Sequence, residues 1–163
     1  MTTIIDGSLG ITFPVTAGSA SAVQASSGRV LQVVNATYST QTTSSSSTYS
    51  DTGLTASITP SSSSSKILII VSQNGVSKSS GNTYVALQLL RNSTSIVVFE
   101  TQIGYTNSTL ETNMASSTNY LDSPATISSV TYKTQFKSPN STNFATVQTG
   151  SSTSTITLME IAA

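Results

Sequence analysis

The chain of 163 residues consists of short runs of β-branched, aromatic and other apolar residues, separated by stretches of Ser, Thr, Asn, Gly and Pro. The alternation is clearest over 54–60, where Leu54, Ala56 and Ile58 fall on one face and Pro60 ends the run. Turn signals recur roughly every 8–12 residues, and no segment requires a helix. This pattern predicts an all-β fold, an antiparallel β-sandwich of jelly-roll type with about eight strands.

Individual segments sharpen that prediction. The run 66–71 is apolar on both faces, which is typical of a central strand covered on each side. Asn74-Gly75 is a strong turn signal, so we expect the chain to reverse directly after this strand. Residues 84–91 could follow a helical period, but their short length and β-rich surroundings favour a strand. Strands are expected over 29–38, 54–60, 66–71, 84–90, 95–103, 127–136, 143–148 and 155–161.

Composition excludes several function classes. Ser and Thr make up 62 residues, whereas charged residues are 7%, against about 25% in an average domain. Six basic and six acidic residues give no basic face for nucleic acid. The chain contains no His and no Cys, so neither a metal or haem cofactor nor a Ser-His-Asp or Cys-His catalytic group is expected. No apolar run approaches the ~20 residues of a membrane span, so no membrane insertion is expected.

The first 28 residues differ from the rest. Apolar residues and turn formers mix as far as Pro14, and 17–28 is mostly Ala, Ser and Gly, without a period that could bury one face. We interpret 1–28 as an extended docking arm with one short strand near Ile11, and 29–163 as a β-sandwich head domain. The opening residues lack the positive region and apolar stretch of a signal peptide, which argues against a secreted bacterial adhesin of similar composition.

Several motifs are similar to those of a known protein family. They are Gly10-Ile11-Thr12-Phe13-Pro14, the strand-like 28–34 (GRVLQVV), the segments 48–60 (TYSDTGLTASITP) and 65–69 (SKILI), and the closing 157–161 (TLMEI). Together they resemble the tail-fibre heads of phages that infect marine and freshwater bacteria, small structural proteins of the virion. One departure is Val15-Thr16, where the family more often has Asp-Gly.

The resemblance implies a compact β head that assembles as a homotrimer on the exterior surface of the virion. The implied partners are further copies of the chain, other virion proteins (fibre, tail or capsid) bound through 1–28, and a host-surface glycan. Typical heads sit at the end of a long shaft, but here only a 28-residue arm precedes the head. The alternative is therefore a capsid decoration protein that stabilises the phage shell.

Candidate binding residues lie in the polar stretch 104–124, which is predicted as a long loop. They are Tyr105, Asn107, Asn119 and Tyr120. Aromatic rings stack on sugar rings, and amides and hydroxyls form adaptable hydrogen bonds, so the stretch has the chemistry of a saccharide-binding surface. An ordinary long loop or a subunit contact would have the same composition, and both alternatives stay open.

The acidic residues show no catalytic constellation. A glycosidase needs two carboxylates at a fixed separation, and no spacing in the sequence fixes any pair among Asp51, Glu100, Glu111 and Asp122. We therefore expect no enzymatic activity and no catalytic residue.

Glu160 raises a structural question, because it falls within the last apolar run. Burying it unpaired would cost several kcal/mol. We expect its carboxylate either to face solvent on an edge strand or to meet Arg29, Lys66 or Arg91.

Overall fold

The computed structural model describes residues 4–6, 10–12, 28–109 and 112–163. Within these ranges the regular structure is β-strand, apart from one short 3-10 turn, η1 (Thr149–Ser151). The all-β prediction is therefore confirmed. In the same ranges, no helix has the length and apolar character needed to cross a membrane.

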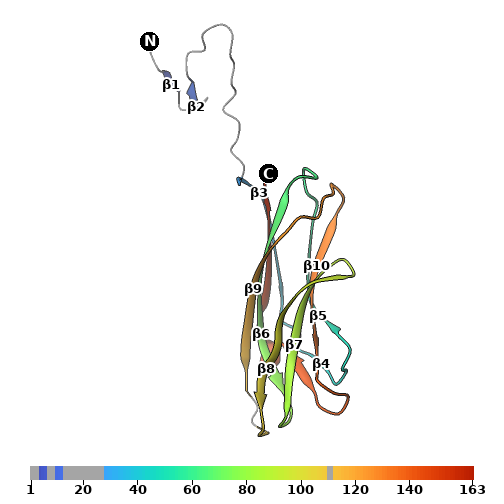
Figure 1. Cartoon of the computed structure of the whole chain (residues 1–163). Helices are drawn as coiled ribbons and strands as arrows, with labels where there is room; N and C mark the ends of the chain where they lie inside the picture. The colour runs from blue at the N-terminus through green and yellow to red at the C-terminus, as the bar shows by residue number, and fades with distance from the viewer. Residues whose placement is uncertain (1–3, 7–9, 13–27, 110–111) are drawn as a thin grey trace.

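Two antiparallel sheets face each other (Figure 1). The four-stranded sheet has the order β5 (Ser50–Ile58), β10 (Val130–Lys137), β7 (Thr83–Arg91), β8 (Thr94–Thr106). The six-stranded sheet contains β3 (Val30–Tyr38), β12 (Ser154–Ile161), β6 (Lys66–Lys78), β9 (Met114–Asp122), β11 (Ala145–Val147) and β4 (Thr42–Ser44). The 13-residue strand β6 is its centre: β12 and then β11 pair along one side, and β9 along the other.

The eight long strands pair as nested hairpins. In chain order, β3 pairs with β12, β5 with β10, β6 with β9, and β7 with β8, all antiparallel. Nested pairs distributed over two sheets are the jelly-roll arrangement. The predicted sandwich type is therefore confirmed, with β4 and β11 as short additions.

The N-terminal region contains a short strand pair. β1 (Ile4–Asp6) pairs antiparallel with β2 (Gly10–Thr12), which confirms the expected strand near Ile11. The remainder of the predicted arm before Gly28 lies outside the described residues. At the start of the sandwich, the Gly28 N–H donates to the Ala162 carbonyl at 2.8 Å, so the two ends of the sandwich meet at one pole.

The core has two apolar clusters separated by buried polar side chains. The larger cluster includes the predicted inward faces of β5 (Leu54, Ala56, Ile58) and β12 (Ile156, Leu158). The smaller cluster surrounds Val76, Leu87 and Phe136. Between them, the Thr134 hydroxyl donates to Gln73 Oε1 at 3.0 Å, and Gln73 Nε2 donates to Ser154 Oγ at 3.0 Å. These hydrogen bonds satisfy buried polar groups that would otherwise destabilise the fold.

The Asn74-Gly75 prediction is wrong, because the chain does not reverse there. Both residues lie within β6, at a bulge where the register with β9 shifts between Gln73 and Val76. Gly75 has a φ of +63°, and a Cβ there would stand 2.5 Å from the Thr149 nitrogen. The glycine therefore permits a close approach of η1, not a hairpin.

The predicted loop over 104–124 is also wrong in extent. β8 continues to Thr106, and β9 occupies Met114–Asp122. The burial along β9 alternates regularly, but its inward residues include Ser116 and Thr118, which carry no apolar signal in the sequence. Small hydroxyl side chains can thus fill the inward positions of a strand. The alternation of such a strand cannot be recognised from the hydropathy of its sequence.

The prediction for 66–71 is right about position and wrong about burial. β6 is the central strand, and Ile67, Ile69 and Val71 are fully buried. On its outer face, however, Ile70 is 41% exposed in the single chain. An apolar central strand with one uncovered face is a surface that a partner can cover.

Neither expectation for Glu160 holds. β12 is an interior strand, and the side chain is fully buried without a basic partner among the described residues. Its carboxylate accepts from the Ser61 N–H at 2.8 Å, the Ser61 hydroxyl at 2.7 Å and Gln32 Nε2 at 2.6 Å. Burial alone would raise the pKa of Glu160, but hydrogen bonds from Ser65, Gln32 and Ser61 lower it to about 2.

Candidate functional site

The four residues expected to form a saccharide surface do not form one cluster. Tyr105 is exposed near the end of β8, and Asn107 is exposed just after that strand. On β9, Asn119 points outward opposite Ile70, whereas Tyr120 packs against the larger core cluster. Tyr105 follows Gly104, which lies beside the Met114 side chain at the start of β9. Tyr120 is six residues beyond Met114 on the same strand, and six residues of a strand span about 20 Å. A single ligand-stacking pair of Tyr105 and Tyr120 is therefore not assembled within one chain.

The candidate acidic residues have separate structural partners. Asp122 accepts from Arg91 Nη1 at 3.0 Å and from the Tyr132 hydroxyl at 2.7 Å. Since Asp122 belongs to β9 and Tyr132 to β10, this contact joins the two sheets. Burial is the main cause that raises the pKa of Tyr132, and the hydrogen bond and charge of Asp122 raise it further. The phenol therefore keeps its proton and donates it in a hydrogen bond to Asp122. Glu111 lies outside the described residues.

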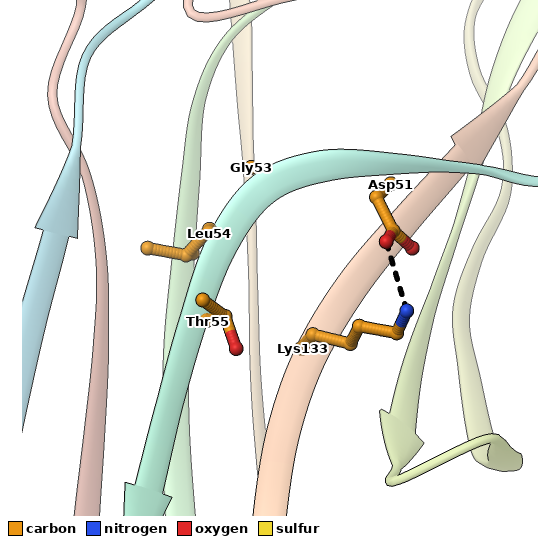
Figure 2. Close-up of a pocket in the computed structure, with 5 residues that line it drawn as sticks. All are labelled: Asp51, Gly53, Leu54, Thr55 and Lys133. Atoms are coloured by element: carbon orange, nitrogen blue, oxygen red, sulfur yellow. Dashed lines mark hydrogen bonds and ion pairs between the residues drawn. The ribbon is translucent and has the colours of Figure 1, made fainter.

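Asp51 belongs to a small hollow of about 160 Å³ beside Gly53, Leu54 and Thr55. Figure 2 shows Lys133 of β10 extending along this hollow toward Asp51 of β5, with an ion pair at 2.8 Å. Burial raises the pKa of Asp51, but hydrogen bonds from Lys133 and Gln135 outweigh it and lower the pKa below its ordinary value. Both charges are thus occupied in joining adjacent strands.

A second hollow, of about 210 Å³, lies on the outer face of the same sheet and is lined by aromatic and polar side chains. We call it the tyrosine hollow; its residues are Tyr49, Tyr84, Ala86, Thr101, Gln102 and Lys137. The register places Ala86 opposite Lys137, and the Lys137 ammonium lies 4.7 Å from the centre of the Tyr49 ring. The small Ala86 side chain leaves a depression between larger neighbours.

A β-bulge shapes one side of the tyrosine hollow. Val85 pairs with Ile103 and Leu87 with Glu100, so Thr101 and Gln102 together oppose the single residue Ala86. Glu100 Oε1 accepts from the backbone N–H groups of both bulge residues, at 3.0 and 3.3 Å. The carboxylate therefore fixes the bulge, and the side chains of Thr101 and Gln102 are exposed beside the hollow.

Sequence reasoning missed the tyrosine hollow because its residues come from three strands, β7, β8 and β10, and from Tyr49 just before β5. Tyr49 and Tyr84 each stand at or near the start of a strand, which is a weak signal that does not indicate they are neighbours. Only the pairing of β10 with both β5 and β7 brings them to the same region. A register-level prediction would have been needed to find this site.

A different surface lies on the outer face of the six-stranded sheet. Val33 pairs with Met159, Met159 with Leu68, and Leu68 with Leu121, so one row of apolar side chains crosses β3, β12, β6 and β9. A second row lies two residues away along the same four strands and on the same face. In the same strand order it consists of Asn35, Thr157, Ile70 and Asn119. Val33 is 56% and Leu121 51% exposed. We call the first set the apolar row; neither row contains a charged residue.

Among the described residues, no group of three or more His, Cys, Asp or Glu side chains could hold a metal ion. No family model matches the chain, and no curated protein matches it. Among solved structures, the chain is similar to the crystal structure of the infectious bursal disease virus VP2 subviral particle, with a TM-score of 0.48 and 12% sequence identity. That similarity covers 85% of this chain and 39% of the other, so the chain spans well under half the length of that protein.

Proposed function

We propose that this chain is a non-enzymatic structural protein of a phage virion, a homotrimeric β head of a tail fibre that contacts host-surface saccharide. The observation that carries the proposal is the apolar row, a set of uncharged side chains on the outer face of the six-stranded sheet. In a monomer this row would face water, whereas contact between copies would cover it. The motif resemblance to tail-fibre heads supplies the assignment to a virion.

The composition of the surface supports the same proposal. Ser and Thr hydroxyls form hydrogen bonds that salt does not screen, and they lose little rotamer freedom when ordered. A zero net charge gives no repulsion between copies. Such a surface suits a particle exposed to water of varying salinity, provided that the apolar row is covered.

Light scattering tests the assembly. We expect the purified chain to have three times the 16.8 kDa mass of one copy. The double variant Val33→Lys/Leu121→Lys places two charges in the apolar row. Because these charges would have to be buried between copies, the variant should have the mass of one chain. Val98→Lys is the matched control, because Val98 is 48% exposed on the other sheet. A monomeric wild-type protein, or a trimeric double variant, would contradict the proposal.

The place on the virion is tested by copy number. A fibre head should be present as a small multiple of the number of fibres, whereas a decoration protein should be present at about one assembly per capsomer. Quantitative mass spectrometry of purified virions separates these two values. A capsomer-like count would replace the fibre assignment with the capsid decoration alternative.

A further inference from the structure

The tyrosine hollow carries an inference that rests on the proposed saccharide contact and gives it a location and a ligand class. We propose that this hollow binds one pyranose unit of an acidic polysaccharide, with the sugar ring against Tyr84 and its carboxylate facing Lys137. This location replaces the predicted cluster around Tyr105 and Tyr120.

The lining has the chemistry that a sugar ring requires. An aromatic ring offers an apolar face for the C–H groups of a pyranose, and amide and hydroxyl groups hydrogen-bond its rim. Tyr84 supplies the ring, and Thr101 and Gln102 supply the rim, held by the bulge that Glu100 fixes. Burial and the neighbouring Tyr84 raise the pKa of Tyr49, so its hydroxyl remains a donor at neutral pH.

Charge selects an acidic ligand. Lys137 is the only charged residue that lines the hollow, and it forms no ion pair with the residues that the structure describes. Its ammonium rests against the Tyr49 ring, which leaves donors for a ligand carboxylate. Two carboxylates come from chain segments near the hollow, and both already have partners. Glu100 Oε1 accepts from two backbone N–H groups, and Asp51 is bound by Lys133 and Gln135.

Size and position fit one unit of a chain. A volume of about 210 Å³ is below the roughly 300–1,000 Å³ of pockets that enclose a whole small ligand. One sugar ring would occupy the hollow, and the rest of the polymer would lie across the exposed sheet. The hollow is near the starts of β5 and β7, whereas Gly28 meets Ala162 at the opposite pole, where β12 ends. An attachment through residues before Gly28 would therefore leave the hollow free.

Nuclear magnetic resonance titration of the full chain tests the inference. The probes are tetrasaccharides of galacturonate, mannuronate and guluronate, with maltotetraose as the neutral comparison. We expect at least one uronate to shift the backbone signals around Ala86 and Thr101 and to bind at least about tenfold more tightly than maltotetraose, about 1.4 kcal/mol. Absence of shifts with all three uronates, or equal affinity for maltotetraose, would overturn it.

Variants assign the site. Tyr84→Ser and Lys137→Gln should each weaken uronate binding at least about tenfold, whereas Tyr84→Phe should retain the stacking and most of the affinity. Tyr105→Ser is the matched control, since Tyr105 is an exposed tyrosine outside the hollow. Loss of binding in Tyr105→Ser with normal binding in Tyr84→Ser would overturn the location. If the chain is a trimer but binds no uronate, this inference is refuted and the proposed trimer is not. If the chain is a monomer but binds uronate, the proposed trimer is refuted and this inference is not.

Discussion

At the scale of single residues, Glu160 shows that hydroxyl, amide and backbone N–H groups can hold a buried charge without an opposite charge. Glu160 is buried in contact with Ser61 and Gln32, and no lysine or arginine among the described residues contacts it. A chain with 7% charged residues has few basic partners to offer. Several neutral donors to one carboxylate can replace an ion pair, because each donor is strengthened by the negative charge.

Glu160 predicts a pH dependence of folding. Its pKa is lowered from 4.5 to about 2 in the folded protein, so the folded state favours the ionised form. The resulting stability is complete above about pH 4.5 and disappears as the pH falls toward 2. Glu160→Gln should lower the free energy of unfolding at pH 7 by about 1.5–3 kcal/mol, a difference that shrinks toward pH 2.

Urea denaturation at a series of pH values measures this effect. Asp51→Asn is the control, because the Asp51 side chain is 53% exposed and its ion pair with Lys133 should contribute less than about 1 kcal/mol. A Glu160→Gln deficit that is the same at pH 7 and at pH 2.5 would contradict the assignment.

The hydroxyl of Tyr132 predicts a second residue-level effect. It donates to Asp122 inside the sandwich and connects β10 to β9. Tyr132→Phe preserves the buried ring and removes this donor, so it should cost about 1–3 kcal/mol of unfolding free energy. Thermal or urea unfolding measures the cost, and an unchanged stability would show that Arg91 alone satisfies the carboxylate.

At the scale of elements, much of the jelly roll could be predicted from the sequence. Alternating apolar residues locate β5 and β12, and a short polar break between 91 and 94 marks the β7–β8 hairpin. β9 was missed because Ser and Thr occupy inward positions. The tyrosine hollow could not be predicted, since strand register, and not sequence spacing, decides which side chains meet across β5, β10 and β7.

The β6 bulge gives an element-level prediction. Gly75 and Gly150 have the same φ of +63°, but only Gly75 has atoms within 4 Å of an added Cβ. Gly150→Ala should cost about 1 kcal/mol from backbone strain alone. Gly75→Ala should cost clearly more, because η1 must move away. Equal losses for the two variants in urea unfolding would mean that the close approach to Thr149 carries no energetic weight.

At the scale of the whole molecule, the two outer faces differ in character. The six-stranded sheet presents the apolar row, and the four-stranded sheet presents the tyrosine hollow and an ion pair. Assembly and ligand binding can therefore use opposite sides of the sandwich without competing. This separation is why the charge variants at Val33 and Leu121 should leave uronate binding unchanged.

The scarcity of ion pairs predicts a weak response to salt. Only two ion pairs occur among the described residues, and each involves a partly exposed side chain. The exposed Lys133–Asp51 pair should contribute at most about 1 kcal/mol, and for a chain of this size 1 kcal/mol corresponds to about 2–4 °C in Tm. Salt screens the Arg91–Asp122 pair much less, because the Asp122 side chain is only 8% exposed. Between about 0.05 and 1 M NaCl, calorimetry should therefore show a Tm decrease of no more than a few degrees. A large decrease would indicate that electrostatics hold the fold.

The hydrogen bond between Gly28 and Ala162 at one pole also determines how the sandwich carries mechanical load. A pull between these two residues would peel β3 from β12 one hydrogen bond at a time. A pull between Gly28 and the tyrosine hollow instead runs along the strands, so the rungs of the β3–β12 ladder resist it together. A particle tethered at the first pole and held by its ligand at the other is thus strained in the direction in which its sheets are hardest to break.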